Sequence, residues 1–277
     1  MSIEIETLGS AAGARLHGAD LSRPLTDNVF GEVRQALLDH LVIFFPDQHL
    51  TPEQHKAFGR RFGTLNVHPH VKALDGHPEV LNIVKEPEMR LNFGGGWHSD
   101  MTFLEKPVLG SILYARVLPR AGGDTMWANM YAAYDALSGG MKRLLDGLVA
   151  IHTADGIYGS GGVYSTNKGM ETMAHEQAAD RAEHPVVRTH PETGRKLLFV
   201  NPAFTVKFKG MSREESRPLL EFLTRHATEA RFVYRHRWSV DEVGFWDNRC
   251  TQHYALNDYP TERRVMHRVT VDGDRPY

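Results

Sequence analysis

Hydrophobic and polar positions along the chain fall mostly into short apolar or alternating runs, which is typical of β-strands. Many short strands with only a few helices favour a β-sandwich or barrel. The sequence Pro191-Glu192-Thr193-Gly194 predicts a hairpin turn between two of these strands. The predicted strands are Leu41–Phe45, Val80–Val84, Gly110–Val117, Thr125–Ala128, Val186–His190, Lys196–Val200, Phe232–Trp238, Val243–Trp246 and Arg264–Val271.

Helical periodicity and capping signals predict helical stretches over 29–40, 51–62, 130–148 and 212–225, the third interrupted at 138–140. The start signal is clearest in the second stretch. There Thr51 is the expected cap, Pro52 takes the first helical position and Gln54 completes a capping box. Residues 156–183 match no element, and a loop of that length is usually functional or disordered.

Composition limits the class of protein. A chain of 277 residues with 41% apolar content can form a large core, and we expect one domain over residues 1–277. The formal net charge of −2 gives no electrostatic reason to expect nucleic acid or a membrane surface as a partner. The single cysteine, Cys250, fits a reducing compartment, and the N-terminus lacks the features of a signal peptide. We therefore expect a cytoplasmic protein.

The pair His98 and Asp100 is the first candidate metal site. In an extended segment, side chains two residues apart point to the same face, so both can reach one ion. His253 is a third candidate ligand, which the fold must bring in from far downstream. Two imidazoles and a carboxylate on one side of a metal leave the opposite positions open, as in non-heme Fe(II) oxygenases. Zinc could use the same three residues for hydrolysis, and the ligands alone leave that alternative open.

Two other triplets have the same spacing of potential ligands. These are His77-Pro78-Glu79 and His190-Pro191-Glu192. Each carries a proline between its potential ligands, so we interpret both as turns and not as metal sites.

The last predicted strand carries two arginines on one face. Residues 264, 266 and 268 share that face, whereas 265, 267, 269 and 271 share the other, which is mostly valine and should pack against apolar neighbours. Arg264 and Arg268 then point into a polar cavity. A guanidinium offers a planar fork that matches an oxyanion, which predicts an anionic ligand there.

Five motifs occur in order along the chain: Trp97–Phe103, Gly122–Thr125, Trp246–Arg249, Gln252–Tyr254 and Arg264–Arg268. Together they resemble the taurine dioxygenase (TauD/TfdA) family of Fe(II)/2-oxoglutarate-dependent dioxygenases, which includes alkylsulfatases and aryloxyalkanoate-cleaving enzymes. The resemblance runs from Gly18 to Asp274. It implies a β-rich α+β fold with a double-stranded β-helix (jelly-roll) core and flanking helices.

The resemblance also implies roles for individual residues. His98, Asp100 and His253 would be the catalytic Fe(II) ligands, with O₂ as the oxidant. Arg264, assisted by Thr125, would bind the distal carboxylate of 2-oxoglutarate. Residues 156–183 correspond to an active-site lid. The positions that match substrate contacts are His68, Tyr158, Phe204 and Arg268.

This chain departs from the taurine dioxygenase pattern near the substrate. Gly94 replaces a pocket asparagine, Ile157 replaces a small polar residue, and His68-Pro69 is followed by His70-Val71 without the expected tyrosine. Fewer polar contacts and more apolar surface favour an anion larger and less polar than taurine.

The predicted reaction is hydroxylation of a C–H bond in a small anionic organic substrate, with formation of succinate and CO₂. The substrate would be an alkyl sulfonate, alkyl sulfate or aryloxyalkanoate, and collapse of the product would often release an oxyanion or a phenol. The alternatives are a zinc-dependent hydrolase on the same ligands and a non-catalytic cupin-like binding protein. We expect a homo-oligomer, either a dimer or a tetramer.

Overall fold

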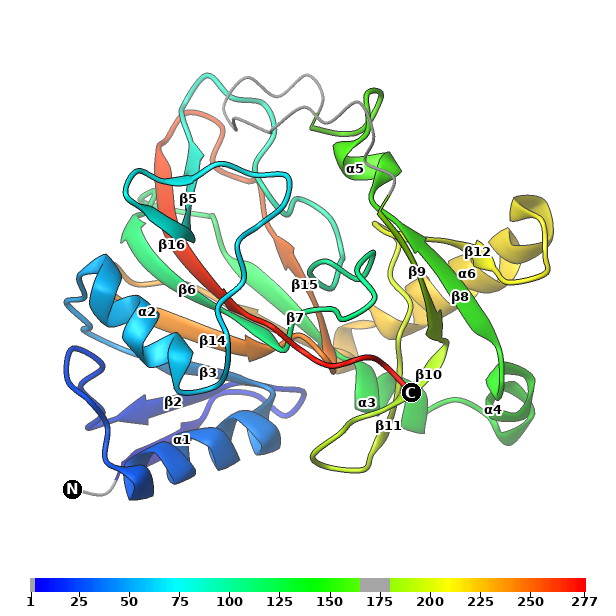
Figure 1. The fold of residues 1–277 in the computed structure, drawn as a ribbon, viewed down its shortest axis with the longest axis horizontal. Coiled ribbons are helices and arrows are strands. Elements are labelled where there is room, and N and C mark those ends of the chain that lie inside the picture. The colour runs from blue at the N-terminus through cyan, green and yellow to red at the C-terminus, as the bar shows by residue number, and fades with distance from the viewer. Residues whose placement is uncertain (1–2, 165–179) are drawn as a thin grey trace.

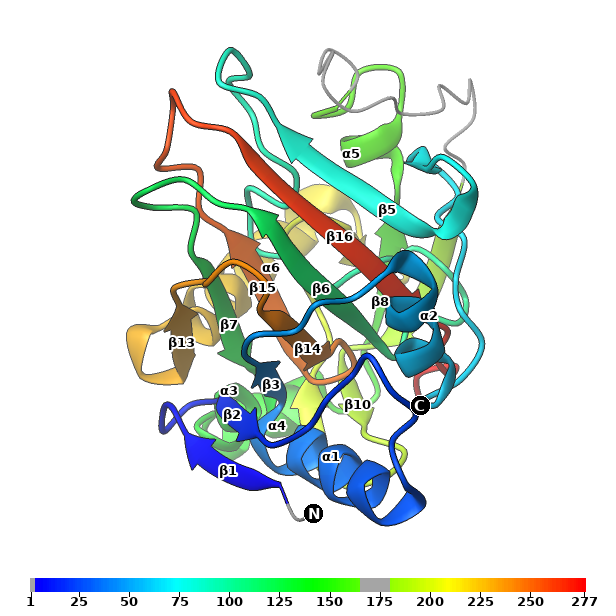
Figure 2. The same ribbon diagram turned by 90° about the vertical axis from the view of Figure 1, so that its left-hand side faces the viewer.

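An eight-stranded sheet dominates the computed structural model, which describes residues 3–164 and 180–277 (Figures 1 and 2). Its strand order is β1-β2-β3-β14-β6-β16-β5-β4, and its neighbours are antiparallel except for the parallel pair β2 and β3. The strands are β1 (Glu4–Thr7), β2 (Ala14–His17), β3 (Val42–Phe45), β4 (Ala73–Leu74), β5 (His77–Lys85), β6 (Gly110–Val117), β14 (Val243–Asp247) and β16 (Arg264–Val271).

Three smaller sheets complete the β-structure. The sheet β13-β7-β15 packs against the inner face of the large sheet, where Trp127 lies 5.9 Å from Trp246 and 5.7 Å from Phe44 between ring centroids. The other two have the orders β12-β8-β9 and β10-β11. Their strands are β7 (Thr125–Asn129), β8 (Val149–Thr153), β9 (Arg181–Pro185), β10 (Val187–Thr189), β11 (Lys196–Leu198), β12 (Thr205–Phe208), β13 (Val233–His236) and β15 (Thr251–Ala255).

Helices α1 and α2 cover the outer face of the large sheet (Figure 2). Alternation along β3 sets the two faces, since Ile43 and Phe45 pack in the cluster beneath these helices while Phe44 packs in the inner cluster. Within the described ranges no helix is long and apolar enough to cross a membrane. The helices are α1 (Asp27–His40), α2 (Pro52–Arg60), α3 (Met130–Asp135), α4 (Gly139–Leu145), α5 (Asp155–Tyr158) and α6 (Arg213–Ala227).

The observed elements agree with most of the predicted ones. Strands β6 and β16 have the predicted bounds, β10 and β11 form the predicted hairpin, and the capping box of Thr51 and Gln54 is present. The strands β1, β2, β4, β8, β9, β12 and β15 were not predicted. The expected β-rich α+β fold is confirmed at this level.

Two predictions about loops need correction. His77-Pro78-Glu79 does not form a turn but begins strand β5, where Glu79 pairs with Lys56. The stretch 156–183, predicted to hold no regular element, contains most of α5 and the start of β9. Residues 165–179 lie outside the described part of the chain, so the lid role of this segment stays a prediction.

The contact between Gly244 of β14 and Trp238 generates a prediction about stability. A Cβ at Gly244 would lie 2.6 Å from the indole of Trp238, so Gly244→Ala overpacks the core and should lower the free energy of unfolding by about 1–3 kcal/mol. Gly31 in α1 has open space around it, so Gly31→Ala should instead raise that free energy by roughly 0.5–1 kcal/mol. Urea denaturation measures both; equal effects would contradict the packing described here.

Candidate active site

The structure brings the three predicted metal ligands together between the two packed sheets. His98 forms an isolated bridge with His253 of β15, in which the His98 N–H donates to the His253 carbonyl at 3.0 Å and the His253 N–H donates to the His98 carbonyl at 2.7 Å. The Nε2 atoms of His98 and His253 lie 3.7 and 3.9 Å from Oδ1 of Asp100. All three side chains are buried, and one ligand atom from each lies within 4.8 Å of the others.

Neighbouring side chains hold Asp100 in this position. Ser111 donates its hydroxyl to Oδ2 at 2.8 Å, and Nη1 of Arg268 donates to Oδ1 at 3.0 Å. Asn248 fixes the backbone, because its Oδ1 accepts the Asp100 N–H at 2.7 Å and its Nδ2 donates to the Asp100 carbonyl at 3.0 Å. The carboxylate therefore has a defined orientation toward the two histidines.

The protonation states of the three ligands suit a divalent cation. Burial favours the neutral carboxyl of Asp100, but the charge of Arg268, together with the two histidines and the hydrogen bond from Ser111, outweighs burial and lowers its pKa. Burial lowers the pKa of His98 and of His253, so both imidazoles are neutral. Metal ligands must be deprotonated, and two neutral imidazoles with one carboxylate are the donor set of non-heme iron sites. The residues present therefore fit the predicted metal.

The two arginines of β16 line one narrow inner cavity beside this triad. Arg264 and Arg268 are both buried, as the predicted common face requires, and Thr125, His98 and His253 line the same cavity. Among the described residues, Nε and Nη2 of each arginine lack a hydrogen-bond partner. Buried unsatisfied cationic donors are costly, so this arrangement favours an anionic ligand.

Thr125 is prepared to donate a hydrogen bond into that cavity. Its Oγ1 accepts the indole N–H of Trp238 at 2.9 Å, which leaves the hydroxyl proton available for an acceptor. Sequence reasoning missed the role of Trp238, because nothing in the sequence indicates that its indole reaches Thr125.

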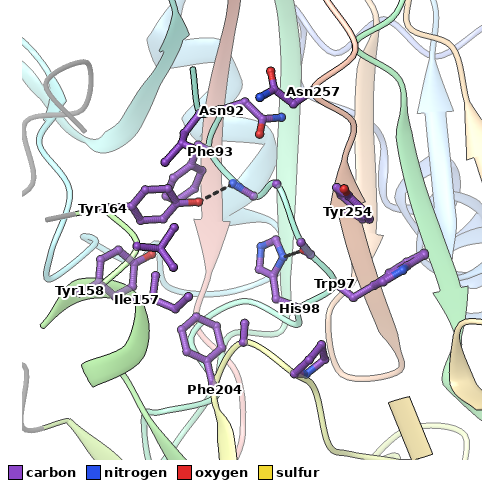
Figure 3. A pocket seen from close by; sticks show the side chains of 17 residues that line it. Asn92, Phe93, Trp97, His98, Ile157, Tyr158, Tyr164, Phe204, Tyr254 and Asn257 are labelled. Atoms are coloured by element: carbon purple, nitrogen blue, oxygen red, sulfur yellow. Dashed lines mark hydrogen bonds between the residues drawn. The ribbon is translucent and has the colours of Figure 1, made fainter. Parts of the chain in front are cut away.

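A larger outer cavity of about 420 Å³ opens on the other side of His98 (Figure 3). No acidic residue, lysine or arginine is among the described residues that line it. Its wall includes Tyr164, whose ring stacks on Phe93 at 5.4 Å and whose hydroxyl accepts the Gly94 N–H at 2.8 Å. Phe93, Gly94 and His98 line both cavities, so the two spaces meet at the triad.

The backbone conformation and the nearby His98 ring explain why residue 94 is a glycine. Its φ is +76°, a left-handed conformation that favours glycine, and a Cβ there would lie 3.2 Å from the His98 ring. A side chain at this position would therefore reach the space beside a metal ligand. Gly94 was predicted at a pocket position, whereas Tyr164 was not predicted as a site residue, because its contacts with Phe93 and Gly94 join segments far apart in the chain.

The four predicted substrate residues occupy different places around the triad. Tyr158 and Phe204 line the outer cavity, and the Phe204 ring lies 6.5 Å from the His98 ring. Arg268 lines the inner cavity and contacts Asp100. His68 lines neither cavity but is buried with its ring 5.6 Å from that of Tyr158.

Burial, assisted by the nearby charge of Arg268, lowers the pKa of His68 to about 3. The imidazole is therefore neutral. Its Nδ1 accepts the His70 N–H at 3.1 Å, so the ring proton lies on Nε2.

A second group of ligand-type residues lies apart from the triad. It consists of His190, Asp247 and Cys250, all buried. Asp247 forms a two-point ion pair with Arg249 and also bonds His190 at 3.1 Å, while burial raises the pKa of the Cys250 thiol. The Asp247 carboxylate is therefore engaged in structural contacts, and the Cys250 thiol is neutral.

Comparisons with known proteins agree with this geometry. A family model described as "Taurine catabolism dioxygenase TauD, TfdA family" matches residues 4–270. The chain is 34% identical to an α-ketoglutarate-dependent sulfate ester dioxygenase of Pseudomonas putida, over 100% of this chain and 91% of that protein. It is 32% identical to an (S)-phenoxypropionate/α-ketoglutarate dioxygenase of Sphingobium herbicidovorans, over 99% and 96%.

The fold is also similar to a solved structure. The crystal structure of a taurine dioxygenase from Burkholderia xenovorans matches with a TM-score of 0.84 and 38% identity, over 100% of this chain and 93% of that one. This chain is an enzyme and belongs to the TauD/TfdA family of dioxygenases.

The pair Asp100–Arg268 generates a prediction about stability in the absence of metal. Asp100→Ala leaves a buried unpaired guanidinium and should lower the free energy of unfolding by about 3–5 kcal/mol. The double variant Asp100→Ala/Arg268→Met removes both charges and should recover most of that loss. Urea denaturation in the presence of a chelator measures both; a single variant as stable as the wild type would show that the pair contributes nothing.

Proposed function

We propose that this enzyme is an Fe(II)- and 2-oxoglutarate-dependent dioxygenase that hydroxylates a C–H bond of an anionic organic substrate. One observation carries the proposal: a buried His-Asp-His triad shares a cavity with two arginines whose Nε and Nη2 atoms lack partners among the described residues. The names of the relatives support the co-substrate and the substrate class, since they include a sulfate ester dioxygenase and a phenoxypropionate dioxygenase.

His98, Asp100 and His253 would hold the iron and leave its remaining positions open for the co-substrate and O₂. When bound, the iron supplies the activation of O₂, coupled to conversion of 2-oxoglutarate to succinate and CO₂. Ser111 and Asn248 contribute by fixing the orientation of Asp100.

Arg264 and Thr125 would bind the distal carboxylate of 2-oxoglutarate in the inner cavity, which both residues line. The guanidinium offers Nε and Nη2 on one edge, which matches a carboxylate in two-point contact, and the Thr125 hydroxyl adds a third donor. The cavity has about 30 Å³ of free volume, room for about two waters. Binding therefore requires lining side chains such as Phe93 to move.

The substrate anion would lie beside Arg268 and His68, with its apolar part in the outer cavity. Arg268 keeps Nε and Nη2 for this anion after pairing with Asp100, and the Nε2 proton of His68 adds a neutral donor. Phe204 and Tyr158 would hold the apolar part and orient a C–H bond toward the metal.

Hydroxylation at a carbon that carries an ester or ether oxygen gives a hemiacetal-type product. That product breaks down to a carbonyl compound and releases the oxygen with its substituent, as sulfate or as a phenol. Among the described residues that line the outer cavity there is no acidic side chain to pair with the ammonium group of taurine, which favours an alkyl sulfate, alkyl sulfonate or aryloxyalkanoate.

The proposal extends to the topology of the core. We infer a double-stranded β-helix core formed by the large sheet and the β13-β7-β15 sheet, with the metal ligands at its open end. The contact of Trp127 with Trp246 between the two sheets and the bridge between His98 and His253 support it. A homo-oligomer and a cytoplasmic location remain predictions.

The two alternative functions differ in their need for the inner cavity. A zinc hydrolase has no use for Arg264, whose Nε and Nη2 lack partners among the described residues, and a binding protein has no need of an open metal position. Metal replacement distinguishes these functions from the proposed one. After treatment with a chelator, Fe(II) should restore succinate formation and Zn(II) should not; restoration by Zn(II) without 2-oxoglutarate would favour the hydrolase.

Arg264→Lys tests the co-substrate site. Lysine keeps the charge but loses the two-point contact, so the affinity for 2-oxoglutarate should fall by a factor that corresponds to about 1–3 kcal/mol. The neighbouring Arg263 is half exposed and pairs with Glu86, so Arg263→Lys is the matched control and should leave that affinity unchanged. Equal effects of the two substitutions would place the co-substrate elsewhere.

The substrate class is tested by succinate release from 2-oxoglutarate in the presence of hexyl sulfate, hexanesulfonate, 2-phenoxypropionate or taurine. At least one of the first three should stimulate release strongly and be consumed in equal amount, because the apolar cavity accommodates its tail. Taurine should stimulate little. A clear preference for taurine would contradict the inferred substrate class, and no stimulation by any anion would contradict the proposed function.

A further inference from the structure

Three aromatic rings form a cluster behind the proposed substrate site. The His70 ring stacks on Tyr158 with a centroid distance of 4.9 Å and an angle of 24°, and His68 meets the edge of Tyr158 at 5.6 Å. The side chain of His70 is only 4% exposed. His70 does not line either cavity, and its ring lies against Tyr158 with Nε2 directed at Asp180.

His70 is itself anchored by Asp180, the residue directly before β9. Its Nε2 lies 2.9 Å from Oδ2 of Asp180. The backbone carbonyl of Asp180 accepts the N–H of Ala154, which is the residue that caps α5. Asp180 therefore holds both the imidazole of His70 and the beginning of the helix that carries Tyr158.

The backbone of His70 acts on His68 in a different way. The His70 N–H donates to Nδ1 of His68 at 3.1 Å, so the ring proton of neutral His68 is on Nε2. The other tautomer of His68, with its proton on Nδ1, would place that hydrogen against the amide hydrogen of His70. The His70 amide therefore determines that Nε2 of His68 carries the ring proton. The His70 ring, which stacks on Tyr158, fixes the position of that tyrosine.

We infer that His70, held by Asp180, is a positioning residue for the substrate pocket, which orders His68 and Tyr158 without contacting the substrate. The expected effect on kcat/KM rests on the proposed function. The expected effect on the order of the pocket does not. Small displacements of groups that orient a substrate can lower kcat/KM by roughly tenfold to a hundredfold.

Two substitutions separate the parts of this arrangement. His70→Phe keeps a ring to stack on Tyr158 but loses the contact with Asp180, and Asp180→Asn changes only a partly exposed carboxylate, so folding is not at risk. The matched control is His226→Phe. His226 is likewise buried, stacked on a ring (Phe222, 5.8 Å) and paired with an acid (Glu229, 3.3 Å), and it does not line either cavity.

The kinetic measurement uses Fe(II)-loaded enzyme with hexyl sulfate, hexanesulfonate and 2-phenoxypropionate. His70→Phe and Asp180→Asn should each lower kcat/KM for the accepted anion by roughly tenfold. Both should also raise the ratio of succinate formed to substrate consumed, with the KM for 2-oxoglutarate unchanged. The double variant should be no worse than His70→Phe, because the two residues act as one unit. His226→Phe should match the wild type in every one of these values.

A second measurement needs no substrate. The amides of Tyr158 and Gly159 are bonded within α5, and their hydrogen exchange should become faster in both variants but not in His226→Phe. If no anion is turned over, the proposed function fails, and exchange alone decides this inference. Unchanged exchange, kinetics like those of the control, or an equal rise in the KM for 2-oxoglutarate would overturn it.

Discussion

The buried ion pair between Asp100 and Arg268 is the interaction on which the rest of the site depends. A carboxylate and a guanidinium in the interior are tolerated only when both are paired, and here the two side chains are 5% and 2% exposed. The pair keeps Asp100 ionised between two neutral imidazoles. It also leaves two nitrogens of Arg268 without a partner among the described residues, so that one ion pair would support both the proposed metal site and the proposed anion site.

The register of β16 places this pair and Arg264 on the same side of the sheet. Antiparallel partners on both sides fix that register, from Arg264 opposite Lys85 to Val269 opposite Val80 on β5, and with β6 on the other side. A slip of one residue would turn both arginines toward α2 and the outer core, where Val269 and Val271 now pack. The apolar packing of α1 and α2 therefore determines where the charges point.

The sequence predicted the parts of this arrangement that depend on local spacing. His98 and Asp100 share a face because they are two apart, and β6 and β16 have strong apolar patterns on at least one face. β15 escaped prediction because its sequence, Thr251 to Ala255, is mostly polar where it borders the site. The contacts of Tyr164 with Gly94, of Trp238 with Thr125 and of His70 with Asp180 join segments far apart in the chain, and no local pattern reports such contacts.

The central claim is that metal and 2-oxoglutarate share one cavity, with the metal at one end and Arg264 at the other. Calorimetric titration of 2-oxoglutarate under exclusion of O₂, into protein with and without Fe(II), tests it most directly. The account predicts that Fe(II) tightens binding by at least about tenfold, because two attachment points act together. Equal affinities with and without Fe(II) would contradict it.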